Sequence, residues 1–78
     1  MKNYRVVGFA KYSGEFEGRA YSGYYLDCVS LDPPGAGFSG QRVKQLKAKE
    51  KIGYVPVVGD DIAVSYGEYG IEEIERIL

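Results

Sequence analysis

The feature that most constrains the fold is a break near the middle of the chain. Residues 32–40 read DPPGAGFSG, and two prolines with three glycines exclude a helix or a strand there. Regular structure must therefore form separately before and after this loop. Because the chain has only 78 residues, we expect one domain, residues 1–78, that hides about 60% of its unfolded surface on folding.

Two strands are predicted before the break. Residues 4–12 (YRVVGFAKY) are rich in β-branched and aromatic residues, and Gly8 among them indicates a bulge or a bend. Residues 13–19 (SGEFEGR) contain two glycines and are expected to form a loop or a hairpin tip. Residues 20–31 then form the second strand.

Alternation assigns the two faces of this second strand. Leu26 and Cys28 fall on one side and suit a core, with Cys28 as a small buried hydrophobe. Asp27 falls on the other side and suits solvent, so Tyr21 and Tyr25 are expected on the solvated face. Three tyrosines within five positions are unusual for so short a chain.

The segments after the break also favour strands. Residues 41–52 are expected to begin as a strand and to include a short helical turn near 47–51. Residues 60–66 (DDIAVSY) alternate as a strand does, and 67–70 (GEYG) are typical of a hairpin turn. Residues 71–78 fit either a strand or a helix, and their place after a hairpin turn favours a strand.

These elements predict an all-β fold of about five strands. Eleven glycines and eight tyrosines support it, because glycine marks tight turns and tyrosine prefers strands. Five antiparallel strands in so short a chain must close or nearly close to avoid bare edges. We therefore expect a small five-stranded OB-like barrel with one short helical turn, and an SH3-like barrel is the alternative.

The composition argues against catalysis. The chain has no histidine, which is the commonest general base, and one cysteine, too few for a zinc site. No phosphate-binding glycine motif follows a predicted strand. Asp60 and Asp61 are interpreted as an acidic turn rather than as a metal site. We expect no enzyme activity, no catalytic residue, no metal, no cofactor and no small-molecule substrate.

The charges are segregated along the chain although the net charge is only −1. Residues 42–51 carry five bases and one acid, whereas residues 60–78 carry six acids and one base. The N-terminal residues lead into no sustained apolar run, and no stretch approaches a membrane span. The sequence is therefore expected to be cytoplasmic, without a membrane partner.

Aromatic and basic residues alternate in a way that favours nucleic-acid binding. Exposed rings stack on unpaired bases, and neighbouring cations contact phosphates. The predicted groove is lined by Lys11, Arg19, Tyr21 and Tyr25, and the phosphate contacts are assigned to Arg42, Lys44 and Lys47.

The order of segments along the chain resembles that of a known family. The segments are a glycine-bearing hairpin, EGRAYSGYYLDCVSLD, a loop, a basic strand and VGDDIAVSYGEYGIEEI. It is similar to the single-stranded DNA-binding proteins of filamentous phages, the gene V type, and to small proteins of phages and conjugative elements. The resemblance spans most of the chain and is carried best by Arg19, Tyr21, Ser22 and Cys28. It implies an OB fold, a dimer, a role in DNA replication, and DNA contacts by Arg19, Tyr21 and Tyr69. Phe16 is a further candidate for stacking on the same hairpin.

Two functions follow as expectations. The first is a homodimeric protein of a phage or mobile element that binds single-stranded DNA, or RNA, with little sequence preference. The second is a small protein–protein interaction module from the same setting, because tyrosine is also enriched at protein interfaces. Cations that converge on the tyrosine face favour nucleic acid, and a neutral or acidic tyrosine face favours a protein partner.

Overall fold

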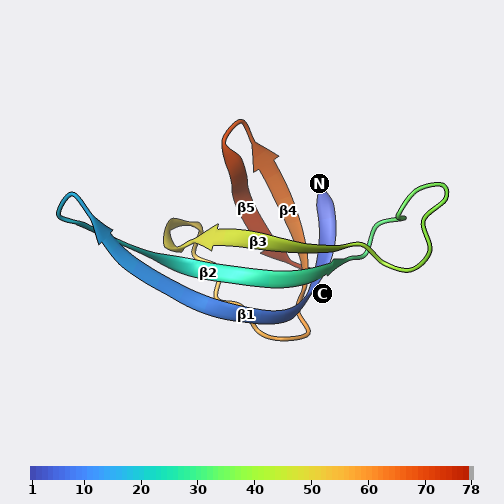
Figure 1. Cartoon of the computed structure of the whole chain (residues 1–78), viewed down its shortest axis with the longest axis horizontal. Coiled ribbons are helices and arrows are strands. Elements are labelled where there is room, and N and C mark those ends of the chain that lie inside the picture. Colours follow the sequence, from blue (N-terminus) through green and yellow to red (C-terminus); the bar gives the residue numbers. More distant parts are fainter. Residues whose placement is uncertain (78) are drawn as a thin grey trace.

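The computed structural model describes residues 1–77, which form five β-strands and one short 3-10 helix (Figure 1). The strands make one antiparallel sheet in the order β3-β2-β1-β4-β5. The all-β prediction, with five strands and a helical turn after the third, is confirmed. The elements are β1 (Lys2–Phe16), β2 (Arg19–Ser30), β3 (Val43–Lys49), η1 (Glu50–Ile52), β4 (Asp61–Gly67) and β5 (Gly70–Arg76).

The sheet does not close into a barrel, which corrects the expected architecture. β3 and β5 are its two edges, and no ladder joins them within residues 1–77. The sheet curls so that the β4–β5 hairpin crosses behind β3, and the two edges approach each other without pairing (Figure 1). Lysines of β3 and glutamates of the β4–β5 hairpin line this seam. β4 pairs with β1 only at Lys2–Arg5, and the β4–β5 hairpin crosses β3 instead of running alongside it, so the two edges do not form a ladder (Figure 1).

The core lies on the concave side of the curled sheet. Leu26, Ile62, Val6 and Val64 have no exposed surface, and they come from β2, β4 and β1. Cys28 packs among them, as its alternation predicted. Burial raises the pKa of the Cys28 thiol to about 11. The alternation assigned to the second strand is therefore confirmed on its core side.

The first hairpin is longer than the sequence predicts. The hairpin tip expected within 13–19 is present but shorter than that range, because β1 continues to Phe16 and the turn consists of Glu17 and Gly18 alone. Both turn residues have positive φ, 51° and 76°, which matches the twist of a two-residue hairpin turn. β3 pairs with β2 no further than Gly23, so the end of this hairpin projects as a two-stranded ribbon (Figure 1).

A bulge at Val7 confirms the irregularity predicted from Gly8 and changes which residues face the core. The register between β1 and β2 shifts between Val6 and Gly8. Before the bulge the even-numbered Val6 is buried, and after it the odd-numbered Phe9 lies opposite buried Leu26. One extra residue in a strand turns every later side chain to the other face.

The loop that precedes β4 is held by a polar cluster around Asp60. Its carboxylate accepts hydrogen bonds from the Tyr54 hydroxyl at 2.6 Å, the Arg76 Nε at 3.0 Å and the Val57 amide at 3.1 Å. The Tyr54 hydroxyl and the Arg76 guanidinium hold the pKa of Asp60 below its usual value. Burial and this hydrogen bond raise the pKa of Tyr54.

Asp61 is bound separately, by Arg5 of β1. The Arg5 Nε and terminal nitrogen donate to its two carboxylate oxygens at 2.7 and 3.1 Å, so each of the two aspartates has its own arginine. Across the described residues, no three metal-ligating side chains come together. The strand predicted at 71–78 is β5, and Leu78 lies outside the described residues.

Candidate nucleic-acid interface

Three tyrosines share the convex face of the β1–β2 hairpin. Tyr12 pairs with Gly23, Tyr21 with Gly14, and Ala10 with Tyr25, and opposed residues of two antiparallel strands lie on one face. Tyr21 is 52% exposed and Tyr25 is 39% exposed. This confirms the solvated face predicted for both residues from the position of Asp27. The ring centroids of Tyr12 and Tyr25 are 4.9 Å apart, and those of Tyr12 and Tyr21 are 6.3 Å apart. We call Tyr12, Tyr21 and Tyr25 the tyrosine face.

Two glycines give the rings space to lie against the sheet. A Cβ on Gly14 would be 2.3 Å from the Tyr21 Oη, and a Cβ on Gly23 would be 2.5 Å from the Tyr12 Oη. Each ring therefore crosses the neighbouring strand at a position without a side chain. This arrangement covers the exposed glycine backbone and presents the rings to solvent.

Lysines of β3 reach the tyrosine face. The Lys47 Nζ lies 4.9 Å from the ring centroid of Tyr12 and 6.0 Å from that of Tyr25. Lys49 pairs with Gly23 and so projects on the same side of the sheet. An ammonium group beside an aromatic ring is the arrangement that binds a base and its phosphate together.

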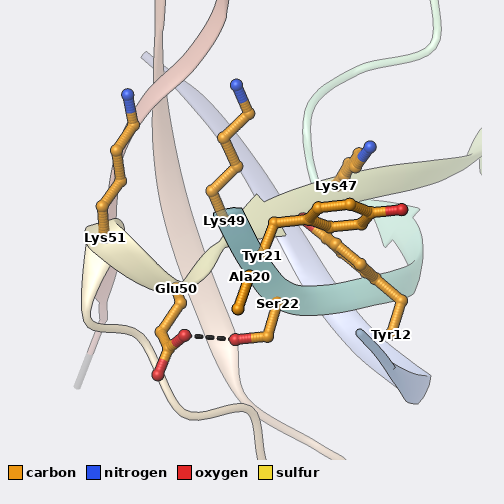
Figure 2. A pocket seen from close by; sticks show the side chains of 8 residues that line it. All are labelled: Tyr12, Ala20, Tyr21, Ser22, Lys47, Lys49, Glu50 and Lys51. Atoms are coloured by element: carbon orange, nitrogen blue, oxygen red, sulfur yellow. Dashed lines mark hydrogen bonds between the residues drawn. The ribbon is translucent and has the colours of Figure 1, made fainter. Parts of the chain in front are cut away.

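An open groove of about 580 Å³ lies at the end of β3, next to the tyrosine face. Figure 2 shows the Tyr21 ring beside that of Tyr12, with Lys49 and Lys51 extending in the same direction. Glu50 turns away from the lysines and accepts a hydrogen bond from the Ser22 hydroxyl of β2. The full lining is Tyr12, Ala20, Tyr21, Ser22, Lys47, Lys49, Glu50 and Lys51.

A second groove, of about 560 Å³, lies across β3 in the open seam of the sheet. It shares Lys47, Lys49 and Lys51 with the first groove, and β4 and its hairpin supply two more tyrosines. Tyr66 is 40% exposed, and the Lys44 Nζ lies 5.0 Å from its ring centroid. Tyr69 at the hairpin tip is 97% exposed.

The two grooves make one basic track along β3 with aromatic residues at both ends. We use "β3 track" for Lys44, Lys47, Lys49 and Lys51. Acidic side chains are also present in the seam, where Glu68 and Glu72 belong to the lining. The first groove contains one carboxylate, Glu50, which is hydrogen-bonded to Ser22.

Several predicted site residues come together, and others do not. Phe16 and Arg19 pair at the hairpin tip on the side of the tyrosine face, where Phe16 is exposed. Lys11 does not reach that face, because the bulge at Val7 places it opposite Tyr24 on the core side of the sheet.

Arg42 also lies apart from the tyrosine face. Its Cζ lies 4.2 Å from the ring centroid of Phe38, and its Nε donates to the carbonyl of Pro34. With Lys2 and Lys44 it lines a separate hollow at the start of β3.

Sequence reasoning missed Tyr12, Lys49 and Lys51 as members of the site. Alternation in 41–52 would have joined Lys47 and Lys49 on one face, and the basic run already contained both. Tyr12 could be found only with the bulge, because the bulge decides its face. Lys51 follows the strand, so its direction depends on the η1 turn.

The fold and this surface define a small all-β protein with one open, curled sheet and a basic, aromatic groove. Comparisons with family models, with curated proteins and with solved structures found no match to this chain. In the part of the chain that the structure describes, no helix has the length and apolarity to cross a membrane.

Proposed function

We propose that this protein binds single-stranded nucleic acid with little sequence preference and without catalysis, and that its main ligand is single-stranded DNA. The observation that carries the proposal is the β3 track. Three of its lysines, Lys47, Lys49 and Lys51, line both grooves, and exposed tyrosines lie on either side. Unpaired bases offer free π faces to the tyrosines, and the phosphates between them need the cations.

The geometry supports stacking without base readout. Tyrosine rings accept any base, because every base has a π face, whereas sequence readout needs directed polar groups. Lysine supplies a mobile point charge and suits a flexible backbone. Both features predict tolerance of sequence and a strong dependence on salt.

The position of the cations also separates this proposal from a protein–protein module. Lys47 and Lys49 lie on the tyrosine face, and Lys47 is within cation–π distance of two of its rings. A negatively charged partner fits that surface better than a neutral peptide does. The role in a phage or mobile element remains part of the proposal.

A fluorescence anisotropy titration with labelled oligo-dT tests it. We expect saturable binding at low salt, and each phosphate contact should contribute a slope of about −0.7 in log K against log salt. The triple variant Lys47→Ala, Lys49→Ala, Lys51→Ala should reduce this slope by about 2. The matched triple arginine variant keeps the charges and should keep the slope.

Duplex DNA and an oligo-U of equal length complete the comparison. Duplex should bind more weakly, because its bases are already stacked on each other and cannot reach the rings. Wild-type protein that binds no oligo-dT at tens of micromolar and low salt would refute the proposal, and the tyrosine face would then be assigned to a protein partner.

A further inference from the structure

The outer edge of β1 has no partner along most of its length. β4 pairs with β1 only at Lys2–Arg5, and the loop before β4 then bonds to Val6 through Gly59 and Asp60. Beyond the bulge, no strand of the described chain pairs with this edge through residues 8–16. Figure 1 shows β1 as the outer strand of the projecting hairpin.

This edge has little of the usual protection against pairing. Natural proteins cover such edges, shorten them, or protect them with proline, charged side chains and bulges, and here the bulge at Val7 lies before the unpaired stretch. Residues 9–16 contain no proline, and their only charges are one base and one acid, Lys11 and Glu15. The charges have opposite sign and are four residues apart, so the strand can face a reversed copy of itself.

We propose that two copies of this chain associate through antiparallel pairing of their β1 edges, with the two-fold axis at Ser13. Such a contact is isologous, as in most homodimers. It joins the two five-stranded sheets into one continuous sheet. The pairing satisfies the backbone N–H and C=O groups that the isolated chain leaves to solvent.

The charges select this register. A strand that pairs with itself is centred on one residue, and residues equally far from the centre face each other. Centring at Ser13 places Lys11 opposite Glu15 of the second copy, twice by symmetry. Centring at position 11 or 15 places like charges opposite each other. Centring at 12 or 14 places neither Lys11 nor Glu15 opposite a residue of the other charge.

The other face of the strand fits the same register. Tyr12 falls opposite Gly14 of the second copy, and no ring has to move, because within each chain Tyr12 lies over Gly23 and Tyr21 lies over Gly14. Phe16 of the second copy falls opposite the small Ala10. No pair in this register places two large rings opposite each other.

Exposed apolar side chains continue from this edge. The bulge residue Val7 is exposed, and the loop bonded to Val6 carries exposed Val57 and Val58. In the proposed register the hairpin tip of the second copy, with exposed Phe16, extends toward this region. A second copy therefore removes apolar surface from water in addition to pairing the edge.

The pairing also has a consequence that rests on the proposed function. Opposed residues of antiparallel strands share a face, so both tyrosine faces lie on the same side of the joined sheet. One strand of nucleic acid then reaches two platforms, which raises the apparent affinity by avidity. The association itself is measured without nucleic acid, so either proposal can fail alone.

Charge exchange tests the register by sedimentation equilibrium. Wild type should dimerise, and Lys11→Glu or Glu15→Lys should each weaken the dimer about tenfold by creating two like-charge pairs. The double variant K11E/E15K exchanges the charges and should return the dissociation constant to within about threefold of wild type. Circular dichroism confirms that each variant is folded.

A cysteine at the two-fold axis gives a second measurement. Two opposed strand residues have Cα atoms about 4.5–5.5 Å apart, within the range of a disulfide. Ser13→Cys should therefore form a covalent dimer under mild oxidation, and Ser39→Cys, in the exposed 32–40 loop, should not. A monomeric wild type, or a dimer that neither responds to the charge exchange nor cross-links at Ser13, would overturn the proposal.

Discussion

Replacing Gly14 with alanine tests whether nucleic-acid binding depends on the position of the Tyr21 ring, because the substitution displaces the ring and leaves its chemistry unchanged. Gly14 lies in β1 without positive φ, so its backbone accepts an alanine. The new Cβ would lie 2.3 Å from the Oη and 2.5 Å from the Cζ of Tyr21. Real Cβ contacts are never so short, and the ring must therefore leave its place over the hairpin.

The expected loss follows from the stacking that the ring supplies. One base stacked on an aromatic side chain contributes about 1–3 kcal/mol. If the displaced ring no longer stacks, the affinity for oligo-dT should fall about 5- to 150-fold. The salt slope should stay constant, because Lys47, Lys49 and Lys51 are not altered.

Stability should respond differently at the two glycines. Gly14→Ala moves only the end of a flexible side chain, so the free energy of unfolding should change by less than about 1 kcal/mol. A Cβ on Gly23 would lie 2.4 Å from the backbone oxygen of Ala48, and β3 itself must shift. Gly23→Ala should therefore cost about 1–3 kcal/mol, measured by urea unfolding.

Tyr21 variants complete the comparison in the same oligo-dT titration. Tyr21→Phe keeps the ring and should bind as wild type, whereas Tyr21→Ala should lose as much affinity as Gly14→Ala. The double variant should lose no more than either single variant, since both remove the same stack. Full affinity of Gly14→Ala beside a weak Tyr21→Ala would refute the reasoning on ring position.

Three further predictions concern the core and the polar cluster. Leu26→Ala removes a fully buried side chain from the second strand and should lower the free energy of unfolding by about 2–5 kcal/mol in a urea titration. The Cys28 thiol, buried and with its pKa raised to about 11, should not react with a thiol reagent at pH 8 until the protein is unfolded in guanidinium. The lowered pKa of Asp60 means that its contribution to stability is present above about pH 4 and is lost as the pH falls through the folded-state pKa. Urea unfolding from pH 7 to pH 3 should therefore show a shallower loss of stability for Asp60→Asn than for wild type.

The sequence predicts the elements well where one strong local signal decides. The proline and glycine loop at 32–40, the GEYG turn and the core side of β2 all follow from steric and burial rules that act within a few residues. The strand at the C-terminal end is also correct, because a hairpin turn leaves β5 next to β4 in the sheet. In each case tertiary packing agrees with the local preference.

The errors arise where packing overrides the local signal. The glycines of SGEFEGR indicate a loop or a hairpin tip, yet the tip is confined to Glu17 and Gly18. Gly14 is a strand residue, and the Tyr21 ring of the opposite strand fills the space that a side chain there would take. The face of Lys11 depends on one bulge residue, Val7, whose position is decided by pairing between strands. No periodicity within β1 alone contains that information.

The expected barrel failed for a different reason. The requirement to cover edges is sound, but it does not state how an edge is covered. β4 pairs with β1 only at Lys2–Arg5, the β4–β5 hairpin crosses β3 without pairing, and the first hairpin extends the β1 edge beyond the rest of the sheet (Figure 1). The direction in which the last hairpin leaves the sheet therefore decides closure, and strand count alone does not.

The projecting hairpin relates the two proposals, because it offers a face and an edge that do not compete. The tyrosine face lies on the side of the sheet where Lys47 approaches, whereas self-pairing uses backbone groups in the plane of the sheet. Lys11 and Glu15 point to the opposite side from the rings, so their pairing between copies leaves the tyrosines accessible. A chain with so small a core gains buried area from the edge and keeps the groove open for a ligand.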